Sequence, residues 1–171
     1  IAAADKITTA DPDNVAGNLK KGYAALLTMA TLGSGQSSLD RVERCKTETA
    51  AVLAKQPDHP YACDVSASCH AFAADAALSR GEDPEPLIRK AVSLLEPAVD
   101  KHPRFLWGLN DLAAIYVFLG TYQQLHGNAD ARETLSKGLR YEEKAVSLDG
   151  TYLVAIANTL NARAKLIAFM D

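Results

Sequence analysis

The sequence predicts an all-α protein made of antiparallel helical hairpins that stack into a solenoid. Apolar residues recur three and four positions apart along most of the chain, which is the spacing of one face of an α-helix. Prolines and glycines interrupt these stretches, and the pattern between them returns after 46 or 47 residues. A period in the forties with two helices per unit indicates a repeat protein, in which neighbouring units bury faces that no unit buries alone.

The clearest hairpin lies in the middle of the chain. Ala91, Leu95 and Ala98 fall on one helical stripe, and Pro103 ends that segment because proline lacks an amide hydrogen and clashes with a continuing helix. A second apolar stripe, which includes Leu112, begins directly afterwards. Two stripes separated by a tight turn predict two antiparallel helices.

The repeat becomes visible when the chain is compared with itself. Pro57 lies 46 positions before Pro103, and over that offset Cys45 falls on Ala91, a small residue on a small one. From Pro103 to Gly150 the offset is 47. The chain is therefore expected to be one domain, residues 1–171, with a partial unit at 1–13, units at about 14–57, 58–103 and 104–150, and a final helix at 151–170.

Each unit contributes two helices in turn. The expected helices are 14–32, 38–55, 60–79, 84–101, 104–126, 129–148 and 151–170, preceded by the end of an earlier helix before Asp11. Gly17 and Gly22 each lower helix propensity by about 1 kcal/mol, so the first hairpin is expected to be the least stable. The helix that starts at residue 104 is expected to continue past Gly120 to about Leu125, because the equivalent stretch 73–79 holds no helix breaker.

The order of small, large apolar and small residues, closed by a proline and followed by leucine and tyrosine one turn apart, resembles the tetratricopeptide repeat. The matching residues are Ala91, Leu95, Ala98, Pro103, Leu112, Ala113, Tyr116, Gly120 and Tyr122. The units are about a dozen residues longer than the usual ~34, and Gly150 replaces the closing proline of the third unit. The resemblance implies a right-handed superhelix in which the first helix of each hairpin lines a concave groove.

The groove residues follow from that resemblance. They are Asn18, Lys21, Asp64, His70, Trp107, Asn110, Asp111, Phe118, Asn158 and Lys165. Asn18 and Asn110 are expected to hold the backbone of an extended peptide, and Trp107 and Phe118 to act as apolar anchors. These positions lack the lysine and arginine residues with which some family members bind the C-terminal carboxylate of a partner. The alternative is that these residues form only a solvated polar face.

A second resemblance concerns residues 80–87. Their sequence, Arg-Gly-Glu-Asp-Pro-Glu-Pro-Leu, resembles the long-unit repeats appended to bacterial, notably myxobacterial, eukaryote-like serine/threonine kinases. None of the kinase glycine-loop, catalytic-loop or metal-binding motifs occurs in the chain. The resemblance implies an interaction or regulatory region of a larger signalling protein. The apolar final helix, 151–170, opens a unit whose second helix is missing, which supports a longer parent array.

Composition and motifs exclude several functions. A net charge of −3 and the lack of any run of four Lys or Arg residues argue against nucleic-acid binding. No apolar stretch approaches the ~20 residues that span a bilayer, so membrane insertion is not expected. No catalytic constellation stands out, and Cys63 with His70 lacks the further ligands of a zinc site. The sequence therefore predicts a protein that is not an enzyme and holds no metal or cofactor.

Three cysteines cannot all pair within one chain. Cys45 and Cys69 take positions that are small or apolar in the other units, so they are predicted to be buried thiols of a reduced, cytoplasmic protein. One intramolecular disulfide, and a periplasmic location, are the alternatives.

The function predicted is that of a scaffold that binds a protein or peptide partner. A second hypothesis is a tetratricopeptide-like accessory protein that binds a small ligand or a transport partner in the periplasm. A third is self-association into a homo-oligomer through exposed ends of the array.

Overall fold

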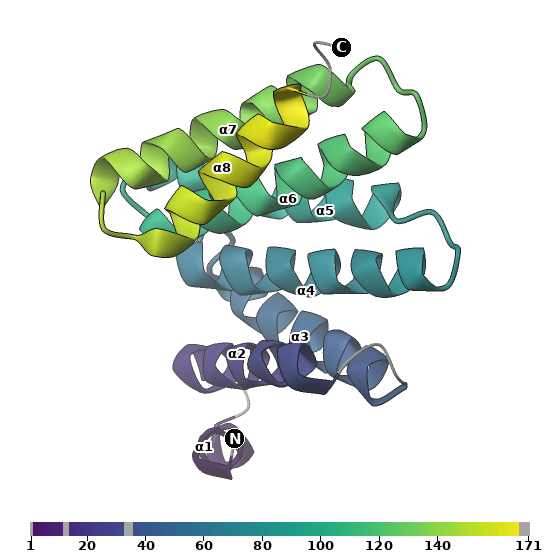
Figure 1. Cartoon of the computed structure of the whole chain (residues 1–171). Coiled ribbons are helices and arrows are strands. Elements are labelled where there is room, and N and C mark those ends of the chain that lie inside the picture. Colours follow the sequence, from purple (N-terminus) through teal and green to yellow (C-terminus); the bar gives the residue numbers. More distant parts are fainter. Residues whose placement is uncertain (1, 12–13, 33–35, 168–171) are drawn as a thin grey trace. The chain divides into compact units, whose positions relative to one another are not determined.

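The computed structural model describes residues 2–11, 14–32 and 36–167, which form eight α-helices and no strand. The all-α class is therefore confirmed. In chain order the helices are α1 (Ala2–Ala10), α2 (Val15–Leu32), α3 (Gln36–Lys55), α4 (Pro60–Ser79), α5 (Glu85–Lys101), α6 (Leu106–Leu125), α7 (Ala131–Leu148) and α8 (Leu153–Ile167) (Figure 1). Each of the seven longer helices begins within two residues of its expected start, and α6 continues past Gly120 to Leu125 as expected.

The chain forms two compact units, Ile1–Ala98 and Val99–Asp171. The border between them falls inside α5, whose last turn belongs to the second unit. Pro57 and Pro103, which the repeat comparison placed at unit ends, both lie in connections between helices.

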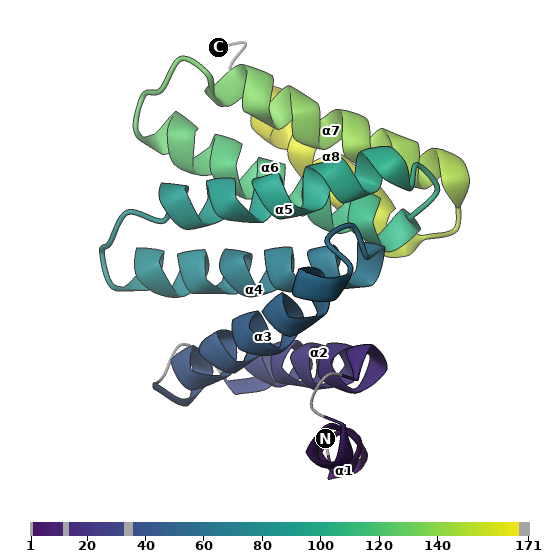
Figure 2. The ribbon, with the colours of Figure 1, turned by 180° about the vertical axis from the view of Figure 1, so that it is seen from behind.

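In the first unit α2 packs against α3, α3 packs against α4, and α2 also contacts α4 (Figure 2). Helix α1 lies against α2. The core between α2, α3 and α4 is a cluster of small and branched side chains, with Leu19, Leu26 and Leu87 at its margin; its buried members are Ala25, Val42, Cys45, Val65, Cys69 and Ala73. These are the apolar stripes that the sequence pattern predicts.

The second unit repeats this three-helix arrangement. Helix α6 packs against α7, α7 packs against α8, and α6 also contacts α8 (Figure 1). Val117, Leu135 and Ala162 form its buried cluster, one residue from each helix, with Leu139 and Leu166 beside them. Each unit thus contains a hairpin followed by a third helix that covers it.

Two glycines allow close approach between helices. A Cβ atom at Gly22 of α2 would lie 2.8 Å from the methyl group of Thr49 on α3. A Cβ atom at Gly120 of α6 would lie 2.7 Å from Leu135 on α7 and 3.0 Å from that residue's backbone nitrogen. The helix propensity lost at these glycines is therefore offset by tighter packing of each hairpin.

Cys45 of α3 and Cys69 of α4 form a disulfide, so the prediction of two buried thiols was wrong. Their Cα atoms are 6.2 Å apart, within the range of protein disulfides, and both residues are fully buried. The pairing arises because the two cysteines lie on facing stripes of packed helices. Cys63 is also buried but takes no part in this bond, and its Sγ lies 3.5 Å from the carbonyl oxygen of Pro57.

Candidate functional site

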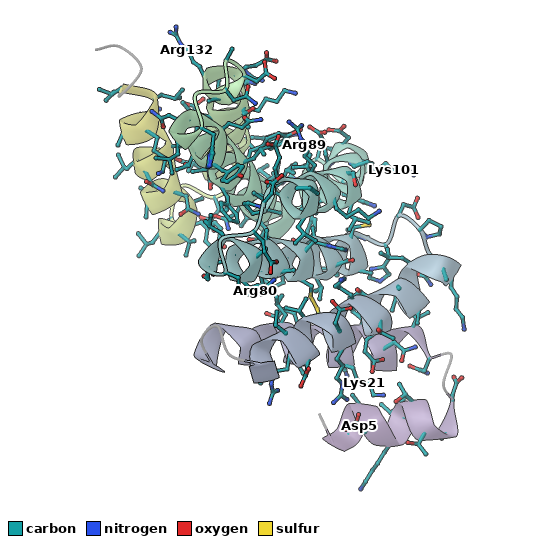
Figure 3. All side chains as sticks on the ribbon, turned by 90° about the vertical axis from the view of Figure 1, so that its right-hand side faces the viewer. Asp5, Lys21, Arg80, Arg89, Lys101 and Arg132 are labelled. Carbon is teal, nitrogen blue, oxygen red and sulfur yellow. A yellow bond between two sulfur atoms is a disulfide. The ribbon has the colours of Figure 1, made fainter. Side chains whose placement is uncertain are left out.

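In the first unit the predicted groove residues lie mostly within contacts of the unit itself. Asn18 and Asp64 are buried. The ammonium group of Lys21 lies 3.5 Å from a carboxylate oxygen of Asp5 on α1 and 3.5 Å from one of Glu48 on α3 (Figure 3). Lys21 therefore forms ion pairs with both α1 and α3, and these pairs help to hold α2 against its two neighbours.

His70, on α4, is partly buried. Burial lowers its pKa, and the nearby positive charges of Lys46 and Lys90 lower it further, although Glu43 acts in the opposite direction. The imidazole is thus favoured in its neutral form near pH 7. The described residues contain no group of three or more His, Cys, Asp and Glu side chains that could hold a metal ion.

In the second unit the structure brings three predicted groove residues together. The Asn158 amide on α8 donates a hydrogen bond to Oδ1 of Asn110 on α6, at 3.1 Å. The Asn110 amide in turn donates to Oδ1 of Asp111, at 2.9 Å. Asn110 is buried, whereas Asp111 and Asn158 are partly exposed, so this polar chain begins under the surface and reaches it.

One face of α6 remains accessible beside these amides. Trp107, Asp111, Ala114 and Phe118 follow one another at intervals of four, three and four residues, so they share a single stripe, named here the α6 stripe. The Trp107 side chain is 54% exposed, Ala114 is exposed, and Asp111 and Phe118 are partly exposed. The α6 stripe therefore presents two aromatic side chains with a carboxylate between them.

Glu142 of α7 is a residue that sequence reasoning missed. Its side chain is 0% exposed, and neither carboxylate oxygen makes a hydrogen bond with the described residues. The pKa of Glu142 is raised to about 8, chiefly by burial; the nearby Asn158 amide opposes this rise, and the negative charge of Asp111 adds to it. At neutral pH the group is therefore mostly protonated.

The internal repeat of the sequence marks position 142 as a core position. Over the 47-residue offset Glu142 falls on Leu95, and both residues are fully buried. A carboxyl group thus occupies a position of the apolar stripe at which the previous unit has leucine. A charged residue at a core position of a repeat is a recognisable anomaly, because such residues are almost never fully buried unless paired.

Helix α8 carries an apolar row that faces away from its buried side. Leu153, Ala157, Leu160, Ala164 and Ile167 are spaced alternately four and three residues apart, and all are exposed; this row is named here the α8 seam. Its three large members are 75%, 63% and 60% exposed in chain order. The buried positions Ala155, Thr159 and Ala162 lie on the opposite side of the helix.

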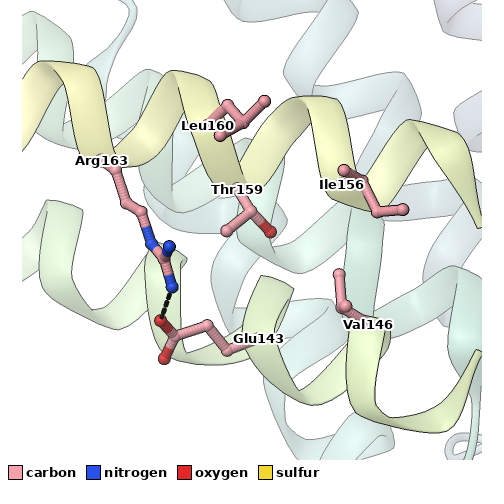
Figure 4. Close-up of a pocket in the computed structure, with 6 residues that line it drawn as sticks. All are labelled: Glu143, Val146, Ile156, Thr159, Leu160 and Arg163. Atoms are coloured by element: carbon pink, nitrogen blue, oxygen red, sulfur yellow. Dashed lines mark hydrogen bonds and ion pairs between the residues drawn. The ribbon is translucent and has the colours of Figure 1, made fainter. Parts of the chain in front are cut away.

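A pocket of about 300 Å³ adjoins the α8 seam between α7 and α8. Its lining is Glu143, Val146, Ile156, Thr159, Leu160 and Arg163 (Figure 4). The Arg163 guanidinium donates to the Glu143 carboxylate at 2.9 Å and closes one side of the pocket (Figure 4). The pocket extends the apolar surface of the seam toward α7.

Among the residues that the structure describes, no helix is both long enough and apolar enough to cross a membrane. The sequence matches no model of a known protein family, and no curated protein is significantly similar to it. The tetratricopeptide resemblance therefore rests on the residues of the chain itself.

Proposed function

We propose that this chain is a tetratricopeptide-like interaction scaffold whose second unit binds a segment of another protein. Two features support the repeat class. Each unit has a helical hairpin covered by a third helix, and glycines lie at close approaches within both hairpins. Such units present side chains on a rigid helical frame, which suits binding rather than catalysis.

The observation that carries the binding proposal is the α6 stripe. Aromatic side chains dominate the energetics of protein interfaces. An exposed tryptophan and a partly exposed phenylalanine, about 16 Å apart along one helix face, therefore offer two apolar anchor points. The neighbouring Asn158 amide and Asp111 carboxylate supply hydrogen-bonding groups for the partner's backbone. The partner expected is a protein segment that offers one or two apolar side chains and main-chain amides.

Replacing Trp107 tests this proposal. We expect Trp107→Ala to lose the proteins that the intact chain captures from an extract of its source cells, because truncating a central aromatic anchor costs about 2 kcal/mol or more, roughly a thirtyfold loss of affinity. The matched control is Leu148→Ala, which removes a large apolar side chain that is 36% exposed on α7, outside the α6 stripe. Quantitative mass spectrometry of the captured proteins gives the readout. Equal partner sets for the Trp107 variant and the intact chain would rule out the α6 stripe as the binding site.

The disulfide bears on where the scaffold works. Disulfides persist in oxidising compartments and are rare in the reducing cytosol of mesophiles. The Cys45–Cys69 bond thus favours a periplasmic or extracellular location over the cytoplasmic one that the cysteine count indicates. We propose that the repeat lies on the outer side of a bacterial inner membrane. Attachment to a serine/threonine kinase remains a proposal that rests on the resemblance of residues 80–87.

A further inference from the structure

We infer that the α8 seam is a homodimerisation surface, on which α8 of a second copy packs in the antiparallel direction. The starting observation is its spacing. Residues alternately four and three positions apart form the seam of a coiled coil, in which each side chain packs into a hole on the facing helix. In the second unit this seam points away from α6 and α7, whose contacts use the opposite side of α8.

The order of residues along the seam makes it complementary to itself. Leucine and alanine alternate from Leu153 to Ala164. When two copies run antiparallel, a single register places Leu153 opposite Ala164 of the second copy and Leu160 opposite Ala157 of the second copy. Each large side chain then faces a small one in four successive layers. Alanines let the two helix axes approach closely, and the two-fold relation uses the same patch on both copies.

Charge does not oppose this pairing. The described part of α8 contains no acidic residue, and its basic residues are Arg163 and Lys165. Arg163 is already paired with Glu143 of its own chain at 2.9 Å. In the proposed register the two Arg163 side chains start about 14 Å apart along the helix axes, beyond the Debye length of about 8 Å at physiological salt. The seam itself is uncharged along its whole length.

The size of the surface predicts a weak dimer. Helix α8 has 15 residues and is about 22 Å long. A single helix pair of that length lies at the low end of stable interfaces, which bury about 1,200 Å² or more in total. We therefore expect a weak dimer, to which the exposed Val154 and the margin of the pocket between α7 and α8 also contribute.

Sedimentation velocity over a hundredfold range of concentration tests the inference. We expect the intact chain to pass from monomer to dimer, and Leu160→Glu to remain monomeric at all concentrations. The variant Ala157→Leu separates specific packing from non-specific apolar contact. It makes the surface more apolar but fills the position that must accept Leu160 of the second copy. It is expected to weaken the dimer at least tenfold. Both positions are exposed, so helix content by circular dichroism should not change.

Three results would overturn the inference. The first is an intact chain that stays monomeric throughout the range. The second is a dimer that Ala157→Leu leaves unchanged or strengthens, which would indicate non-specific apolar contact instead of leucine-on-alanine packing. The third is a dimer that Leu160→Glu leaves intact, which would place the contact between the copies elsewhere on the chain. None of these results bears on the α6 stripe, because Trp107 is not part of the seam.

Discussion

The free energy of unfolding of the second unit is expected to fall as the pH rises from about 4.5 to about 8, and Glu142 is the cause. The pKa of this buried carboxyl is raised to about 8 from an ordinary value of 4.5. Below pH 4.5 the Glu142 carboxyl is protonated in both the folded and the unfolded chain, so its titration does not lower the free energy of unfolding. Between the two values the unfolded chain releases the proton while the folded chain keeps it, and stability is lost. Above about 8 both forms are ionised and the loss is complete.

The expected loss of unfolding free energy is large. Each pH unit between the two pKa values corresponds to about 1.4 kcal/mol, so the full loss is on the order of 5 kcal/mol and about two-thirds of it is present at pH 7. Glu142→Gln removes the titration, and Glu142→Leu restores the residue type of Leu95 in the preceding unit. Both variants should be more stable than the intact chain at pH 7 and less dependent on pH. Urea unfolding followed by circular dichroism at pH 5, 7 and 9 measures this.

The neighbouring residue supplies the control. Glu143 is exposed and pairs with Arg163, so Glu143→Gln should change stability by less than about 1 kcal/mol at every pH. A profile in which Glu142→Gln behaves like Glu143→Gln would show that the Glu142 carboxyl is not held in a desolvated site.

The second large effect concerns the disulfide. Breaking the Cys45–Cys69 bond should lower the free energy of unfolding of the first unit by about 3 kcal/mol, because the bond closes a loop with a sequence separation of 24 in the unfolded chain. The double variant Cys45→Ala, Cys69→Ala should unfold at lower urea concentration than the intact chain in the absence of reductant. Reductant should then destabilise the intact chain and leave the double variant unchanged.

Thiol counting provides the control for that experiment. Denatured, unreduced protein should show one reactive thiol, from Cys63, and three after reduction. Three reactive thiols before reduction, in protein purified from an oxidising compartment, would contradict the disulfide.

The positions of the helices could be predicted because local signals and the repeat agree. Proline at Pro57 and Pro103, and apolar stripes such as Ala91, Leu95 and Ala98, mark each helix independently of its neighbours. The exposed Trp107 and the partly exposed Phe118 of the α6 stripe were named from the tetratricopeptide resemblance instead.

The features that could not be predicted depend on which faces meet in three dimensions. The Cys45–Cys69 pairing requires the register between α3 and α4, and an odd number of cysteines argued against it. The ion pairs of Lys21 with Asp5 of α1 and Glu48 of α3 likewise depend on how the helices pack, which the sequence pattern does not reveal. Glu142 was missed because a polar residue on a helix is expected to face solvent, and only its equivalence to Leu95 marks the position as core.

The most direct test of the binding proposal is site-specific photocrosslinking from Ala114, an exposed residue in the centre of the α6 stripe. A photoreactive amino acid introduced there should form a covalent adduct with a discrete partner protein in living cells. The same group at Leu148, which is exposed on α7 and lies outside the α6 stripe, should not. We expect an adduct at position 114 that disappears when Trp107 is also changed to alanine. An adduct of equal yield from both positions, or none from position 114, would contradict the binding proposal.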